Sequence, residues 1–99
     1  MTKLPKTFIR ESASQLQDIN NPVHLYLIDD GKDPLKDKTA YREVVLTKGA
    51  EVIDIVYYKR AYMAKHDYRK IESELITYGY EKAKELAQYI EHHHAMQCE

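Results

Sequence analysis

The chain has no tryptophan, one phenylalanine and one cysteine among its 99 residues. Leu, Ile, Val and Phe together number 22, just above the level at which chains tend to stay disordered. The hydrophobic share of 43% therefore depends heavily on nine tyrosines. A chain of this length holds one hydrophobic core. We expect one small domain over residues 1–99, with residues 1–7 and 95–99 flexible. Association with a second copy or with a partner would help to stabilise this domain.

Long apolar runs are also missing. No run spans a bilayer, and residues 1–12 lack the apolar stretch of a signal peptide. The single Cys98 has no second cysteine with which to form an intramolecular disulfide, which fits a reducing compartment. A formal net charge of -1 excludes a polycation that coats nucleic acid. These features predict a cytoplasmic protein that is not inserted in a membrane.

Glycine is scarce, and the motifs of common catalysts are absent. The three glycines, Gly31, Gly49 and Gly79, lie too far apart to build a glycine-rich phosphate loop. Neither G-x-S-x-G nor HExxH occurs. A thin core also gives little means of enclosing a dry pocket. We therefore expect a protein that is not an enzyme.

The N-terminal half is predicted to hold a helix and a strand. Residues 9–19 (IRESASQLQDI) suit a short amphipathic helix, which Asn20, Asn21 and Pro22 would end. Residues 23–28 (VHLYLI) are short, apolar and partly β-branched, as in a strand. Residues 29–38 are polar and predict a solvated connector. Their acidic residues lack the glycine and glutamate spacing of a calcium loop.

Residues 40–58 allow two interpretations. Valine, isoleucine and tyrosine are dense on both sides of Lys48-Gly49, which favours a β-hairpin that turns at the glycine. The alternative is a helix that starts at Asp33-Pro34 and ends at Gly49, followed by a second helix. We favour the hairpin because β-branched residues are so concentrated here.

The C-terminal half has helical periodicity. Tyrosine, alanine and aliphatic residues recur at alternating spacings of four and three, which places them on one side of a helix. This seam consists of Tyr57, Ala61, Ala64, Tyr68, Ile71, Leu75 and Tyr78. After Gly79 a second stripe begins, made of Ile76, Tyr80, Ala83, Leu86, Ala87 and Ile90. Two helices that meet near Gly79 fit this pattern best, and one helix bent at Gly79 is the alternative.

These elements predict an α+β fold. It consists of a short N-terminal helix, a small antiparallel sheet of about three strands, and two C-terminal helices packed on the sheet. An all-α helical bundle, with residues 34–58 helical as well, is the alternative. The alanine-tyrosine seam suggests that part of the surface is buried against a second copy, so we expect a homodimer.

The first candidate site lies in residues 57–70 (YYKRAYMAKHDYRK), which combine tyrosines with basic residues. On a helix, Tyr58, Tyr62, Lys65 and Arg69 would share one face, with His66 beside them. Rings for stacking and cations for phosphate suit a nucleotide or a single strand. Tyrosine and arginine are also favoured anchors in protein interfaces. A solvated basic face whose tyrosines cover a small core is the plainer interpretation.

The second candidate site is the C-terminal segment, residues 91–99. If the helix continues, Glu91, His94 and Cys98 lie on one face at spacings of three and four, and all are acceptable zinc ligands. The sequence has no second cluster that supplies a fourth ligand. An exposed terminus with incidental metal affinity is the plainer interpretation.

Small size, near-neutral charge and surplus tyrosine predict a non-enzymatic regulatory or inhibitory protein that acts by binding another protein. In composition the chain is similar to small proteins carried by bacterial viruses and mobile elements. A nucleic-acid- or nucleotide-binding protein and a zinc-linked module are the alternatives. Charge placement discriminates between the first two, because a continuous basic surface favours nucleic acid whereas tyrosines framed by mixed charges favour a protein.

Overall fold

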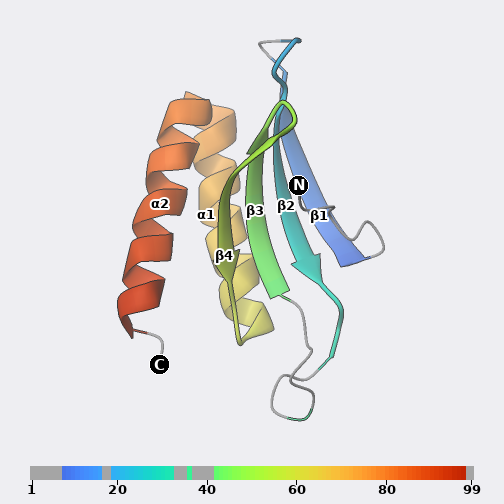
Figure 1. Ribbon diagram of the computed structural model, residues 1–99, viewed down its shortest axis with the longest axis vertical. Helices are drawn as coiled ribbons and strands as arrows, with labels where there is room; N and C mark the ends of the chain where they lie inside the picture. Colours follow the sequence, from blue (N-terminus) through green and yellow to red (C-terminus); the bar gives the residue numbers. More distant parts are fainter. Residues whose placement is uncertain (1–7, 17–18, 33–35, 37–41, 98–99) are drawn as a thin grey trace.

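The computed structural model of the chain describes residues 8–16, 19–32, 36 and 42–97. Four strands precede two helices: β1 (Ile9–Gln15), β2 (Val23–Asp29), β3 (Arg42–Lys48), β4 (Glu51–Tyr57), α1 (Ala61–Tyr78) and α2 (Tyr80–Gln97). The strands form one antiparallel sheet in the order β1-β2-β3-β4, and both helices lie on the same side of it (Figure 1). The predicted α+β class is therefore confirmed, and the all-helical alternative is wrong.

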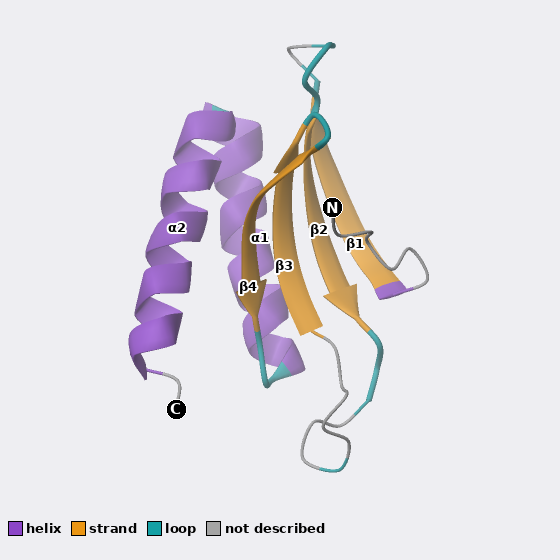
Figure 2. Ribbon diagram, in the orientation of Figure 1, coloured by secondary structure: helices purple, strands orange, loops and turns teal. Residues whose placement is uncertain are grey.

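The hairpin and the strand at residues 23–28 form as predicted. β3 pairs with β4 around a tight turn in which Gly49 has a φ of 62°, a backbone conformation that side chains disfavour. The Gly49 N–H donates to the Pro22 carbonyl at 2.8 Å, which ties this turn to the start of β2. Figure 2 shows the four strands as one continuous twisted sheet. The sheet has four strands instead of about three.

The predicted N-terminal helix is wrong, because residues 9–15 form the additional strand. Antiparallel pairing with β2 supplies backbone hydrogen bonds that a short isolated helix lacks, and this tertiary contact overrides a weak local pattern. Two of the apolar residues that suggested the helix, Leu16 and Ile19, are 60% and 86% exposed. They therefore make no amphipathic helical face.

The core lies between the helices and one face of the sheet. Its members are the buried residues Val23, Leu25, Leu27, Val44, Leu46, Val56, Tyr58, Ala64, Tyr68, Ile71, Leu75, Ala83, Ala87 and Ile90. The centre of the predicted seam, from Ala64 to Leu75, is thus buried against the chain's own sheet. Its ends are exposed, and Tyr57 belongs to β4. The seam therefore gives no ground for a homodimer, which stays a prediction.

The helices meet at Gly79, as the interrupted periodicity predicts. This residue has φ 100° and ψ -170°, and its N–H donates to the carbonyls of Glu74 and Leu75. Neither helix, over the part of the chain that is described, is apolar enough to cross a membrane. The predicted flexible segment 1–7 lies outside the described residues. Of residues 95–99, the first three continue α2 and the last two lie outside the described part.

Candidate functional site: a pocket at the start of α1

Of the five residues predicted to form a basic, tyrosine-rich face, the structure keeps three together on one side of α1 and places Tyr58 and His66 elsewhere. Tyr58 precedes α1, is 7% exposed and belongs to the core. Its hydroxyl donates to Asp67 Oδ2 at 2.9 Å. Burial, followed by the effect of Asp67, raises the pKa of Tyr58 well above its usual value. Tyr58 is therefore a core residue held by α1 and has no exposed ring for a ligand.

Tyr62, Lys65 and Arg69 share one side of α1, as their spacing predicts. Tyr62 is 69% exposed, and Lys65 is exposed one turn further along. Arg69 reaches β1, where Nη1 donates to Glu11 Oε1 and Nη2 donates to Glu11 Oε2 at 3.1 Å. Ile76 continues this row at helical spacing and is 67% exposed. We call Tyr62, Lys65, Arg69 and Ile76 the α1 flank.

His66 lies outside the α1 flank. Its ring is mostly exposed, and Nδ1 lies 3.3 Å from Asp67 Oδ1. His66 therefore lies near the carboxylate that holds Tyr58, and it is not among the residues that line the neighbouring pocket.

A pocket of about 440 Å³ opens where α1 begins beside β1 and the end of β2. It is lined by Arg10, Glu11, Leu27, Asp29, Ala61, Tyr62 and Lys65. Two of the predicted site residues, Tyr62 and Lys65, therefore meet residues from two strands. Leu27 and Ala61 add apolar surface, whereas the other five side chains are polar, charged or aromatic.

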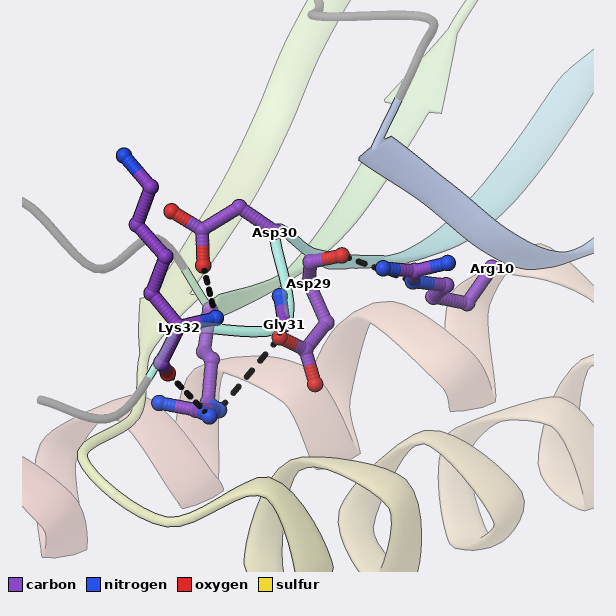
Figure 3. Close-up of polar contacts among 6 residues, drawn as sticks. Arg10, Asp29, Asp30, Gly31 and Lys32 are labelled. Atoms are coloured by element: carbon purple, nitrogen blue, oxygen red, sulfur yellow. Dashed lines mark hydrogen bonds and ion pairs between the residues drawn. The ribbon is translucent and has the colours of Figure 1, made fainter.

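An irregularity in β1 contributes to this pocket. Ile9 pairs with Ile28 and Glu11 pairs with Leu27, so Arg10 is an extra residue between two consecutive pairs. Such bulges redirect a side chain at the edge of a sheet. The Arg10 Nε donates to the Asp29 backbone carbonyl at 2.7 Å, which fixes the arginine stem beside the pocket (Figure 3).

The segment after β2 is held by its own aspartates. Asp29 Oδ1 accepts from the Gly31 N–H at 2.7 Å, and Asp30 Oδ1 accepts from the Lys32 N–H at 3.0 Å (Figure 3). Arg42 lies beneath this segment, with Nε 3.5 Å from Asp29 Oδ1 and Nη2 donating to the Lys32 carbonyl. Residues 29–32 are therefore held by hydrogen bonds within a segment whose last two residues are exposed, and Asp29 is the residue of this segment that lines the pocket.

The charges in the pocket divide into paired and unpaired groups. The two lining carboxylates have arginines near them, since Glu11 binds Arg69 and Asp29 lies next to Arg42. Within the described part of the chain, no carboxylate lies within ion-pair distance of Arg10 or Lys65. The first turn of α1 also contains no acidic residue, and Arg60 makes no side-chain cap. The formal charges of the pocket lining therefore sum to zero, and its two cations, Arg10 and Lys65, are the members without an ion pair to a described carboxylate.

A second polar cluster lies between β4 and α2. Asp54 is 7% exposed, and its Oδ2 has no hydrogen-bond partner among the described residues. Burial and the neighbouring Glu91 raise the pKa of Asp54 to about 7. Glu91, predicted as a zinc ligand, thus interacts electrostatically with a buried carboxyl group.

The zinc prediction is otherwise untested. The His94 side chain and Cys98 lie outside what the structure describes. Among the described residues, no group of three or more His, Cys, Asp or Glu side chains is arranged to hold a metal ion.

Sequence reasoning missed Arg10, Glu11 and Asp29 as pocket residues. Arg10 and Glu11 fell in the segment predicted as a helix, and Asp29 fell in a segment interpreted as a connector. The one local signal was the alternation of the polar residues Arg10, Ser12 and Ser14 with a set that includes the apolar Ile9 and Ala13, which is a strand pattern. That alternation is weak because Glu11 and Gln15 on the inward side are also polar.

Comparison of the chain with protein-family models, with curated proteins and with solved structures gives no match in any of the three. The site is therefore interpreted from its own geometry.

Proposed function

We propose that this chain is a small, non-enzymatic regulatory protein of the inhibitory kind, which acts by binding another protein. The α1 flank and the adjacent strand β1 are its binding surface. The partner contributes an extended segment that runs along β1 and contacts the α1 flank with its side chains.

The observation that carries this proposal is the mixture of charges around Tyr62. The Tyr62 ring is exposed beside Lys65 and Arg10, but also beside Glu11 and Asp29. Exposed tyrosines next to arginines are typical anchors of protein interfaces, and mixed charges set the orientation of a partner. A surface for a nucleic-acid strand would instead present a continuous track of unpaired cations.

The ion pairs of Arg69 support a protein partner over a nucleic acid. Arg69 donates to Glu11, and its Nη1 also lies 3.6 Å from Glu72 Oε1. Its charge is therefore already balanced by carboxylates, and the basic row that the sequence indicates loses its last cation to an ion pair. Phosphate binding at this position would first have to break the ion pair with Glu11.

The position of β1 in the sheet also supports the proposal. β1 is an edge strand, α1 packs mainly on β2 and β3, and α2 packs on β4. The sheet thus extends one strand, β1, beyond the strands that α1 mainly covers (Figure 1). Arg69 of the α1 flank reaches this strand through Glu11. An edge strand can pair with an extended segment of another protein, and a neighbouring helix can then select its side chains.

Affinity capture from the cells that make the protein tests the proposal. The baits are the parent, the flank variant Tyr62→Ser/Ile76→Ser, and the control Tyr78→Ser/Tyr89→Ser. All four side chains are at least 61% exposed, so neither variant disturbs the core. We expect a protein that the parent and the control retain and that the flank variant loses. Equal capture by all three baits, or loss with the control alone, contradicts the proposed surface.

The same proposal places the protein and its partner in the cytoplasm, and it includes the compositional similarity to proteins of phages and mobile elements. A homodimer through two paired β1 edges would use the same strand as the partner, so the two would compete. Native mass spectrometry of the full chain tests this, because a dimer through β1 is expected to be sensitive to the flank variant. A monomer at micromolar concentration contradicts the homodimer and leaves the partner-binding surface unaffected.

A further inference from the structure

The pocket at the start of α1 has features that a protein partner alone does not require. It combines two cations that lack a carboxylate partner within the described structure, Arg10 and Lys65, with an exposed aromatic ring, Tyr62. The positive end of the α1 dipole lies at the same place, because Ala61 begins the helix and also lines the pocket. These groups together attract an anion.

We propose that this pocket binds a nucleoside monophosphate or a ligand of the same build, a phosphate group joined through a sugar to a planar base. Arg10 and Lys65 hold the phosphate, and the base stacks on Tyr62. The inference goes beyond the proposed partner binding, and it concerns the protein by itself.

The pocket has room for more than a bare anion. Ligand pockets typically enclose about 300–1,000 Å³. The volume of about 440 Å³ falls in this range and leaves room for a ring system beside the phosphate. A flat base can stack on the exposed Tyr62 ring, which a bare anion cannot do.

The two carboxylates in the lining agree with a sugar between phosphate and base. Asp29 uses Oδ1 for the Gly31 N–H and for Arg42, and no hydrogen bond joins Oδ2 to a described residue. A carboxylate oxygen accepts readily from a sugar hydroxyl. Each carboxylate lies beside an arginine outside the pocket lining, Asp29 beside Arg42 and Glu11 beside Arg69, so Arg10 and Lys65 have no ion pair to a described carboxylate.

Titration of the full chain, followed by the backbone amide spectrum in nuclear magnetic resonance, tests the proposal. The probes are adenosine monophosphate, adenosine, inorganic phosphate and phosphotyrosine. We expect the monophosphate to shift the amides of Arg10, Ala61, Tyr62 and Lys65 and to saturate at the lowest concentration of the four. Raising the salt concentration should weaken it, because the phosphate contacts are exposed to solvent.

Lys65→Gln is the sharpest variant, because Lys65 is exposed and makes no ion pair with a described carboxylate, so we expect the fold to tolerate the change. One charge-assisted contact corresponds to about a tenfold loss of affinity. Lys70→Gln is the matched control, because Lys70 is an exposed lysine of α1 that does not line the pocket. Tyr62→Ser should weaken the monophosphate and leave inorganic phosphate unchanged.

Four results would overturn the proposal. They are the absence of saturable shifts, equal affinity of parent and Lys65→Gln, equal affinity for adenosine and its monophosphate, and preference for phosphotyrosine or bare phosphate. None of them bears on the capture experiment, in which the partner is recovered without added nucleotide. Failure of the nucleotide site and failure of the partner-binding surface are therefore distinguishable.

Discussion

Arg69 and Glu11 are 58 residues apart in the chain, yet the arginine fork donates to both carboxylate oxygens of the glutamate. This paired contact joins α1 to the edge strand β1, where the two elements otherwise touch little. It also pairs Glu11, one of the two carboxylates in the pocket lining, with a cation from outside the lining. One ion pair thus connects the placement of the strand with the electrostatics of the site.

The ion pair between Arg69 and Glu11 should contribute a measurable interaction energy to folding at low salt. In a double-mutant cycle with Arg69→Gln and Glu11→Gln, the interaction energy should be favourable and should decrease as salt is added, because both side chains are partly exposed. Urea denaturation of the four proteins at two salt concentrations measures it. A coupling that is absent at low salt, or independent of salt, would show that the pair does not form in solution.

Ile71 and Ile76 lie on the same helix but in opposite environments. Ile71 is fully buried, and Ile76 is 67% exposed. Replacing Ile71 with alanine should cost about 2–5 kcal/mol in free energy of unfolding, because it leaves a cavity under α1. The same change at Ile76 should cost less than about 0.5 kcal/mol. Similar costs for both variants would contradict the orientation of α1.

Gly79 holds the junction of the two helices in a conformation that only glycine adopts readily. Its φ of 100° with ψ of -170° is strained for any residue with a β-carbon. Gly79→Ala should therefore lower the free energy of unfolding by about 1–3 kcal/mol. Thr77→Ala, two residues earlier and exposed, is the control and should be nearly neutral. A stabilised Gly79→Ala protein would indicate one continuous helix.

Asp54 is expected to make stability fall as pH rises. Its pKa increases from 3.8 to about 7 on folding, through burial and then Glu91, so the folded chain binds a proton that the unfolded chain has released. The contribution of Asp54 to the free energy of unfolding should therefore be greatest below about pH 4. It should be lost progressively as the pH rises to about 7. Asp54→Asn should flatten this dependence.

Above neutral pH, Asp54→Asn should be more stable than the parent, on the order of a few kcal/mol, because the amide carries no charge to bury. Urea denaturation at several pH values measures both effects. Tyr58 also lies close to Asp54, but it stays protonated throughout this range because its pKa is raised. Equal pH profiles for parent and variant would contradict the buried carboxyl group.

The hairpin and the C-terminal helices were predictable because their signals are local. β-Branched residues on both sides of Lys48-Gly49 and the repeat from Ala64 to Leu75 each specify their element without distant contacts. β1 was not predictable in this way. Its sequence, IRESASQ, has a single β-branched residue, and it is a strand only because β2 offers a partner.

The site was only partly accessible from the sequence for the same reason. The spacing of Tyr62, Lys65 and Arg69 correctly placed them on one side of α1. Tyr58 was placed on that side by extending the helix too far, whereas the chain between β4 and α1 buries it. Arg10 and Asp29 line the pocket because β1 pairs with β2 in one particular register, which the sequence does not reveal. A one-residue bulge in β1 sets the position of Arg10.

The central claim is that the partner binds along β1 and the α1 flank. Hydrogen–deuterium exchange of the chain, alone and with the captured partner, tests it most directly, because β4 is the other edge strand of the same sheet and serves as an internal control. We predict slower exchange in residues 9–15 and at the start of α1, with residues 51–57 unchanged. Protection confined to β4 or α2, with β1 unaffected, would contradict the claim.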